Sequence, residues 1–87
     1  MNNKRGDLNL LYVFQAVMEE RNVGRAAAAL SMTQPAVSNA LGRLRHLFKD
    51  ELFIRCAGGM KPTQTAIDLW PQIHDSVSAM STIMFPA

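Results

Sequence analysis

Amide, hydroxyl and guanidinium groups gather along one side of a short segment in the middle of this chain. Read as a helix, the segment has an apolar stripe at i, i+4, i+7 and i+11, formed by Val37, Leu41, Leu44 and Phe48. Its other side carries Gln34, Pro35, Ser38, Asn39, Gly42, Arg45 and His46, with no carboxylate before Asp50. An ordinary solvated helix mixes acidic and basic side chains. We therefore expect this side to face a polyanion or the edges of nucleic-acid bases.

The residue types of this region suit DNA in two ways. Gln34 and Asn39 can each form two hydrogen bonds to adenine, although Gln34 could instead help to cap its own helix. The arginines can contact phosphates, the alternative being a solvated charge; they are Arg25, Arg43, Arg45 and Arg55. Gly42, inside the helix, costs roughly 0.5–1 kcal/mol relative to alanine, and it either allows a close approach of DNA or is a tolerated penalty.

Two helices are expected to come before this segment and to position it. The first is predicted to start with Asn9 as its N-cap, to end at Arg21, and to pack into the core through Leu10, Phe14 and Val17. The second is predicted to start at the N-cap Asn22 and to end at Leu30. Its alanines allow a neighbouring helix to approach closely, as a helix-turn-helix requires.

A tight turn then leads into the polar helix. We expect Ser31 and Met32 to form the turn, with the side chain of Met32 pointing inward. Thr33 is the predicted N-cap, and Pro35 is tolerated in the first turn because the N–H that it lacks would have no partner there.

A short hairpin is predicted after the polar helix. Residues 52–56 favour a strand, residues 57–60 a turn, and Lys61 with Pro62 a short returning strand. Arg55 and Lys61 would lie at the base or tip of this wing, where they could reach phosphates or a minor groove.

A long last helix is expected from the N-cap Thr63 to about Met84, before Pro86, with Pro71 kinking it or displacing its start. Apolar residues recur in it with the spacing of a coiled-coil seam: Ala66, Trp70, Ile73, Val77, Met80 and Met84. This stripe could pack on the first helix, but a partner helix from a second copy of the chain is the prediction.

Composition and charge limit the class of protein. The 87 residues fit one domain, and they contain no apolar run near the ~20 residues that span a bilayer. Residues 21–63 hold seven basic and two acidic residues, a charge of +5, whereas the flanks hold two basic and five acidic residues, a charge of −3. A basic centre favours a polyanionic partner, although a solvated surface would also explain it.

Catalytic and metal chemistry is not expected. His46 and His74 lie far apart with no ligand spacing around them, and Ser38 has no candidate base. We therefore expect no enzyme activity, no cofactor and no metal. Cys56 is the single cysteine, and the N-terminus lacks a secretory signal, so a cytoplasmic location is the prediction.

In its motifs the chain resembles the N-terminal DNA-binding domain of LysR-type bacterial transcriptional regulators. The similarity runs from about residue 8 to residue 71. Its motifs are Arg25-Ala-Ala27, Thr33-Gln-Pro-Ala-Val-Ser38, Leu52-Phe-Ile-Arg55 and Pro62-Thr63. The segments Asp7-Leu-Asn-Leu-Leu11 and Gln34-Pro-Ala-Val-Ser-Asn-Ala-Leu41 are similar to the branch that holds nodulation, aromatic-degradation and LeuO-like regulators.

The resemblance implies a mainly α fold: a winged helix-turn-helix of three helices plus a short two-stranded wing, followed by a long linker and dimerisation helix. We expect the first part to be residues 1–62 and the helix residues 63–87, with the family's effector-binding domain absent. The implied partners are double-stranded promoter DNA, read as an interrupted palindrome, and a second copy of the chain. A small-molecule effector is implied only for a full-length form, and no membrane is implied.

The resemblance also implies roles for single residues. Gln34, Pro35, Ser38 and Asn39 match base-reading positions, Thr33 and Arg43 match phosphate contacts, and Arg55 matches the wing arginine. Two positions depart from the family pattern: Gly24 replaces a threonine or serine, and Asn39 replaces a common arginine, which changes the expected base from guanine to adenine. A protein-interaction module built on the same fold is the alternative function.

Overall fold

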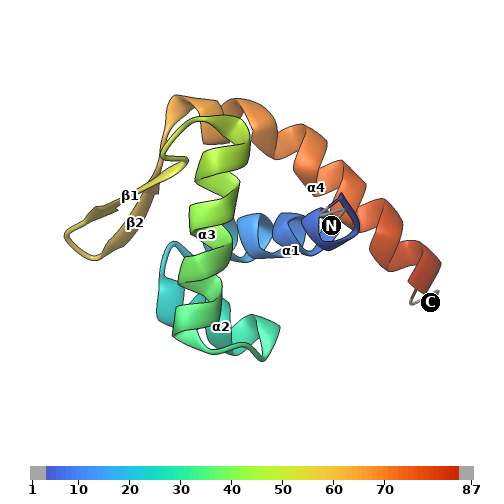
Figure 1. Cartoon of the computed structure of the whole chain (residues 1–87), viewed down its shortest axis with the longest axis horizontal. Coiled ribbons are helices and arrows are strands. Elements are labelled where there is room, and N and C mark those ends of the chain that lie inside the picture. Colours follow the sequence, from blue (N-terminus) through green and yellow to red (C-terminus); the bar gives the residue numbers. More distant parts are fainter. Residues whose placement is uncertain (1–3, 85–87) are drawn as a thin grey trace.

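Four helices and one antiparallel hairpin make up residues 4–84, the part of the chain that this computed structural model describes (Figure 1). In chain order the elements are α1 (Lys4–Glu20), α2 (Val23–Leu30), α3 (Gln34–Phe48), β1 (Phe53–Cys56), β2 (Gly59–Pro62) and α4 (Gln64–Met84). This order confirms the predicted mainly α winged helix-turn-helix with a long last helix.

The first helix begins earlier than predicted. It starts at Lys4, so Asn9 lies inside α1, and the prediction of Asn9 as an N-cap is wrong. The residues from 4 to 8 include no proline and contain good helix formers such as lysine, arginine and leucine, which lets the helix extend toward the N-terminus. At the other end Arg21 adopts a left-handed backbone conformation, with φ of 56°, and ends the helix one residue earlier than expected.

Both predicted caps of the helix-turn-helix are confirmed. The backbone N–H of Arg25 donates to Oδ1 of Asn22 over 2.8 Å, and the backbone N–H of Ala36 donates to Oγ1 of Thr33 over 3.2 Å. Each such cap stabilises a helix by roughly 1 kcal/mol. Together they fix where α2 and α3 begin, and hence which side of α3 faces outward.

The turn between these helices places Met32 differently from the prediction. Ser31 takes a left-handed conformation, and the side chain of Met32 is 37% exposed instead of pointing inward. Ala26 and Ala27 are buried in the core beside α3. The backbone N–H of Met32 donates to the oxygen of Ala27 over 2.9 Å, which holds Met32 at the end of α2, outside the core.

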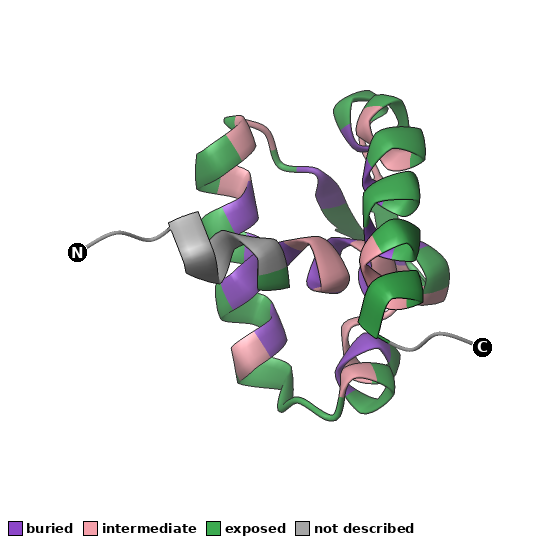
Figure 2. Cartoon of the chain, turned by 90° about the vertical axis from the view of Figure 1, so that its right-hand side faces the viewer, coloured by how far each residue is buried: buried purple, intermediate pink, exposed green. Residues whose placement is uncertain are grey.

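The core forms around α1, which lies between the helix-turn-helix and α4 (Figure 1). The buried sides of the helices point toward this centre in Figure 2. Phe14 is fully buried, and its ring lies 5.1 Å from that of Phe53 and 6.3 Å from that of Trp70, measured between centroids. One side chain of α1 therefore joins the base of the wing to α4.

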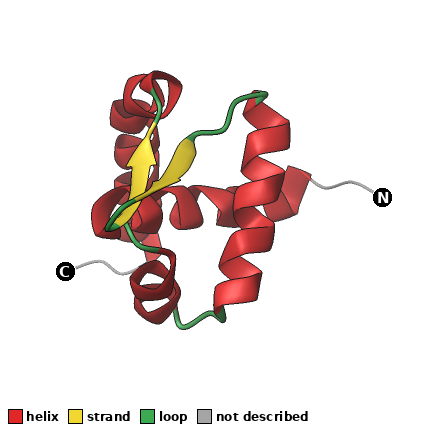
Figure 3. Ribbon diagram, turned by 90° about the vertical axis from the view of Figure 1, so that its left-hand side faces the viewer, coloured by secondary structure: helices red, strands yellow, loops and turns green. Residues whose placement is uncertain are grey.

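The wing is a tight hairpin, seen beside the helices in Figure 3. Phe53 pairs with Pro62, Arg55 with Met60, and Cys56 with Gly59, so the turn consists of residues 57 and 58 only. The expected turn over residues 57–60 is therefore too long, because Met60 is a strand residue with a buried side chain. Leu52 is buried but lies outside the strand, with φ of 64°.

The last helix begins as predicted and extends to Met84, the last described residue. The backbone N–H of Ala66 donates to Oγ1 of Thr63, whose own hydroxyl donates to Oδ2 of Asp50 over 2.9 Å. The helix continues through Pro71 to Met84, so this proline does not displace its start. Figure 1 shows α4 running across the top of the molecule before it slopes down toward its end. Pro86 lies outside the described residues.

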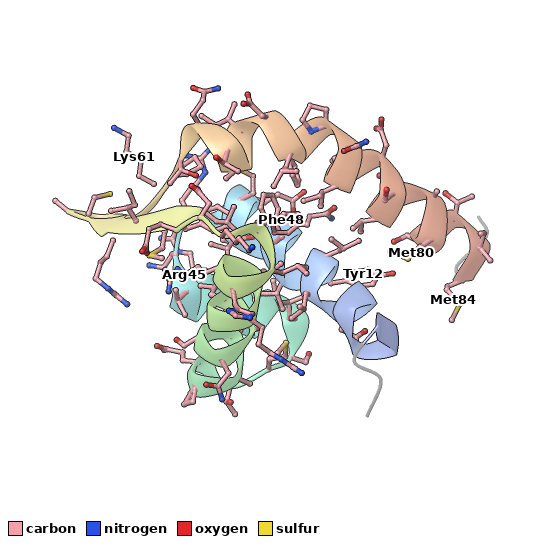
Figure 4. All side chains as sticks on the ribbon, turned by 45° about the horizontal axis from the view of Figure 1, so that its top comes forward. Tyr12, Arg45, Phe48, Lys61, Met80 and Met84 are labelled. Carbon is pink, nitrogen blue, oxygen red and sulfur yellow. The ribbon has the colours of Figure 1, made fainter. Side chains whose placement is uncertain are left out.

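The predicted seam of α4 packs mainly on this chain's own core. Ala66, Ile73 and Val77 are buried, and Trp70 and Met80 are partly buried against the same core. Burial in this chain's own core, to which α1 and α4 both contribute, leaves Ala66, Ile73 and Val77 little surface for the predicted partner helix. Met84 differs from them: it lies in the last turn (Figure 4) and is 67% exposed.

Candidate nucleic-acid interface

The polar side of α3 is exposed along its whole length. Val37, Leu41 and Leu44 turn into the core and fix the orientation of the helix. The exposed residues are Gln34, Pro35, Ser38, Asn39, Gly42, Arg43, His46 and Leu47. No residue of α3 carries a carboxylate. The outer face of this helix therefore offers amides, a hydroxyl and positive charge without a competing negative group.

One flank of α3 forms a recess with the wing and the start of α2. Gln34 and Ser38 line it from α3, and Arg55 lines it from β1. The remaining residues of its lining are Asn22, Val23, Gly24, Gly59 and Met60. The structure thus brings together two of the predicted base-reading residues and the predicted wing arginine, although Ser38 and Arg55 are separated by 17 positions in the sequence.

Gly24 lines the recess without a side chain. A Cβ atom at this position would lie 3.2 Å from both Oδ1 of Asn22 and Nε2 of Gln34. The side chain of Gln34 therefore lies over the first turn of α2, in space that a threonine or serine would partly fill. A side chain at position 24 would therefore press on the Gln34 amide and move it by a few tenths of an ångström.

Arg55 and Lys61 lie on opposite faces of the wing. Arg55 pairs with Met60, whose side chain is buried, and so belongs to the face of the hairpin that turns toward the helices. Lys61 pairs with Ile54, which is 52% exposed, and projects from the outer face (Figure 4). Because side chains alternate along a strand, Lys61 does not line the recess with Arg55. A contact between Lys61 and a phosphate outside this recess stays a prediction.

The other flank of α3 forms a second groove, next to α1. Asn39 and Arg43 line it together with Asn9 of α1 and the exposed Met32. Its apolar part consists of Leu10, Val13, Ala36 and Ala40. The sequence predicted Asn9 to be the N-cap of the first helix, and so did not indicate that its side chain lines this groove. The predicted base-reading residues are thus divided between the two flanks of one protruding helix.

Arg45 makes hydrogen bonds within the chain that the sequence did not predict. Its Nε donates to the backbone oxygen of Glu51 over 2.9 Å, and its Nη2 donates to the backbone oxygen of Phe53 over 3.0 Å. Its Nε also lies 3.6 Å from Oε1 of Glu51. In Figure 4 Arg45 lies at the end of α3 near the wing. It therefore ties the last turn of α3 to the first residue of β1 and positions the wing.

The remaining predicted phosphate contacts are exposed. Arg25 lies on α2 and Arg43 on α3, both on the surface. Thr33 is also exposed, and its hydroxyl oxygen already accepts the capping hydrogen bond, which leaves the hydroxyl hydrogen available as a donor.

Residues 4–84 offer neither a metal centre nor a membrane span. Within this range no group of three or more histidine, cysteine or acidic residues could hold a metal ion. None of the described helices is both long and apolar enough to cross a bilayer. Cys56 is exposed at the end of β1, next to the turn of the wing.

Several known proteins are similar to this chain in sequence and in fold. Residues 8–66 match the family model described as bacterial regulatory helix-turn-helix protein, lysR family. The chain is 52% identical over 71 residues to the transcriptional regulator LeuO of Escherichia coli, an alignment that covers 82% of this chain and 23% of LeuO. The chain spans about a quarter of the length of the curated relatives that it matches.

Two solved structures extend the comparison. A probable transcriptional regulator from Pseudomonas aeruginosa is 46% identical with a TM-score of 0.83, over 85% of this chain and 25% of that one. The DNA-binding domain of BenM, crystallised with catB site 1 DNA, is 29% identical with a TM-score of 0.61, over 92% of this chain and 98% of that one. The similarity to BenM therefore extends over nearly the whole of a DNA-binding domain that was crystallised on its own with DNA.

Proposed function

The chain belongs to the lysR family of bacterial regulatory helix-turn-helix proteins, and from this premise we propose that it binds promoter DNA as a homodimer, with α3 of each protomer in the major groove. It is the helix-turn-helix DNA-binding domain of such a regulator, and its relatives are transcriptional regulators, not enzymes. The proposed site is an interrupted palindrome, because a two-fold symmetric dimer presents two equivalent helices.

The observation that carries this proposal is the exposed face of α3, free of carboxylates and flanked by Arg55. A helix with its side chains is about 10–12 Å across, which fits a major groove about 12 Å wide. The buried Val37, Leu41 and Leu44 hold the polar side outward. With α3 in the groove, the recess on its wing side would hold one DNA strand against Arg55, and the groove on its α1 side would hold the other against Arg43.

The proposed DNA contacts then fall into two groups of residues. The base-reading group is Gln34, Pro35, Ser38 and Asn39, and the backbone group is Arg25, Thr33, Arg43 and Arg55. Gln34 and Asn39 suit adenine, whereas Ser38 can donate to or accept from any base edge. Arg45 and Lys61 are left out of both groups, Arg45 because it is bonded to the backbone of residues 51 and 53, and Lys61 because it lies on the outer face of the wing and not in the recess.

A salt titration tests the binding itself. A labelled duplex of random sequence is titrated with the chain, followed by fluorescence anisotropy at several salt concentrations. For a dimer with three phosphate-contacting arginines in each half-site, the affinity should fall steeply as salt rises, with a logarithmic slope of several units. An affinity that is independent of salt would contradict the proposal and favour a module that binds protein through apolar contacts.

Asn39→Ala is expected to relax the choice of base at one position in each half-site. Because one amide pair to a base discriminates by roughly 1–3 kcal/mol, the selected duplex should lose that preference at that position alone. Competition between the selected duplex and single-base variants measures the effect, with Gln72→Ala, an exposed amide of α4, as the control. Unchanged preferences in the Asn39 variant would show that this amide reads no base.

Arg55→Ala is expected to weaken binding to all duplexes alike and to lower the salt slope by about one unit for each phosphate that loses its arginine. Lys61→Ala is the matched control, because it removes a positive charge from the other face of the same hairpin. We expect little change for Lys61→Ala. A loss confined to one base pair would contradict the backbone contact of Arg55, and equal losses in both variants would contradict the division of the wing into two faces.

The homodimer is proposed to form through the end of α4. Ile83 and Met84 are exposed, and Met80 lies beside them at helical spacing and is partly buried. These three residues form one apolar surface that the chain's own core leaves largely uncovered. A second copy could cover it without disturbing Ile73 or Val77.

Ile83→Asp combined with Met84→Asp is expected to halve the mass in solution. Both residues are exposed, so the fold should remain intact while the two charges oppose burial in an interface. Analytical ultracentrifugation measures the mass, and Ser78→Asp adds a charge to another exposed part of α4 as the control. A dimer that persists in the double variant would exclude this surface as the interface.

The remaining elements of the proposal concern the whole regulator. We place it in the bacterial cytoplasm, because its proposed target, promoter DNA, lies there. The longer form implied by its relatives is proposed to bind a small-molecule effector in a separate domain. The present chain accounts for the DNA-binding part.

A further inference from the structure

Gly42 lies in the middle of the exposed face of α3, where a glycine makes the helix less stable than an alanine would. Ser38 precedes it by one turn, Asn39 by three residues, and His46 follows it by one turn, all on the same side of the helix. Either contacts within the chain or contacts with a partner molecule should explain why a glycine stands at this position.

The fold does not require this glycine. A Cβ atom built at Gly42 meets no atom within 4 Å, whereas at Gly24 it would press on Gln34 and at Gly59 on the backbone of Arg21. Gly42 is also absent from the residues with a left-handed backbone, which include Gly58 and Gly59. Neither packing nor conformation within the described chain accounts for a missing side chain at this position.

We infer that Gly42 determines how deeply α3 enters the major groove and thereby controls sequence recognition. Ser38 and Asn39 have short side chains, which reach a base edge only when the helix backbone lies close to the floor of the groove. The helix with its side chains nearly fills the width of the groove. A side chain at position 42 would project from the same face and hold the backbone away from the bases.

This inference rests on the proposed function and is tested with Gly42→Ala and Gly42→Leu. Both variants should melt at a higher temperature than the wild type, because the new side chain meets open space and favours the helix. Both should bind the duplex selected by the wild-type chain more weakly, the leucine variant by about tenfold or more, the size of a single hydrogen-bonded pairing with a base. Binding to a random duplex should change far less. Gln72→Leu adds a similar side chain to an exposed site on α4 as the control.

The outcomes separate this inference from the proposed function. A leucine variant that is more stable and binds the selected duplex as tightly as the wild type would overturn the inference and leave DNA binding intact. Equal losses on selected and random duplexes would also overturn it, because the effect would then not depend on the bases. A wild-type chain that binds no duplex would overturn the proposed function itself.

Discussion

Gly59→Ala is expected to displace the wing and to lower the free energy of unfolding by about 2 kcal/mol or more. A Cβ atom at Gly59 would lie 2.1 Å from the carbonyl oxygen of Arg21, and the φ of this residue is +143°. The obstacle is backbone and cannot rotate away as a side chain could. The same carbonyl accepts a hydrogen bond from the N–H of Met60 over 2.8 Å, so moving it would also break the hydrogen bond that docks the wing.

Gly58→Ala is the matched control for this prediction. Gly58 has a φ of +89°, but a Cβ atom there meets nothing within 4 Å. This variant should lose only about 1 kcal/mol through backbone strain. Urea denaturation compares the two variants, and anisotropy with a random duplex shows whether the displaced wing weakens binding. Equal denaturation midpoints would contradict the close contact between the wing and Arg21.

Ile73→Asp is expected to cost several kcal/mol and to leave the chain largely unfolded at ordinary temperature. Ile73 is 6% exposed and packs in the core between α4 and α1, where a carboxylate would have no partner. A domain of this size has a total stability of only about 5–15 kcal/mol. Circular dichroism and urea denaturation measure the loss.

Ile67→Asp makes the same substitution on the same helix at a residue that is 48% exposed, and it should change the stability little. The comparison decides between two interpretations of the apolar stripe of α4. If Ile73→Asp kept the wild-type midpoint and only converted a dimer to a monomer, the stripe would pack against a partner helix. The structure predicts the opposite, because α1 covers Ile73 in the same chain.

The sequence alone predicts much of this fold because its local signals are strong. Asn22 and Thr33 have the side chains that N-caps need, and both cap their helices in the structure. The stripe through Val37, Leu41 and Leu44 fixes which side of α3 is buried. Once this stripe is buried, the polar residues on the opposite side of α3 must face outward.

The errors arise where the outcome depends on contacts between distant residues. A heptad stripe such as that of α4 has the same spacing whether it packs on its own chain or on another, so Ile73 and Val77 could not be assigned from spacing. The length of the hairpin turn depends on how the strands pair, so the sequence did not show that Met60 is a strand residue whose buried side chain lies opposite Arg55. Arg45 looked like other exposed arginines, because its acceptors are backbone oxygens that no sequence motif shows.

The most direct test of DNA reading by α3 is selection of the purified chain against a library of random duplexes, followed by sequencing of the bound fraction. We expect an enriched interrupted palindrome, with equivalent half-sites whose centres lie about one helical turn apart or a multiple of it. Substituting Asn39 should then alter one position in each half. No enriched sequence, together with binding that does not depend on salt, would contradict the central claim that α3 reads DNA.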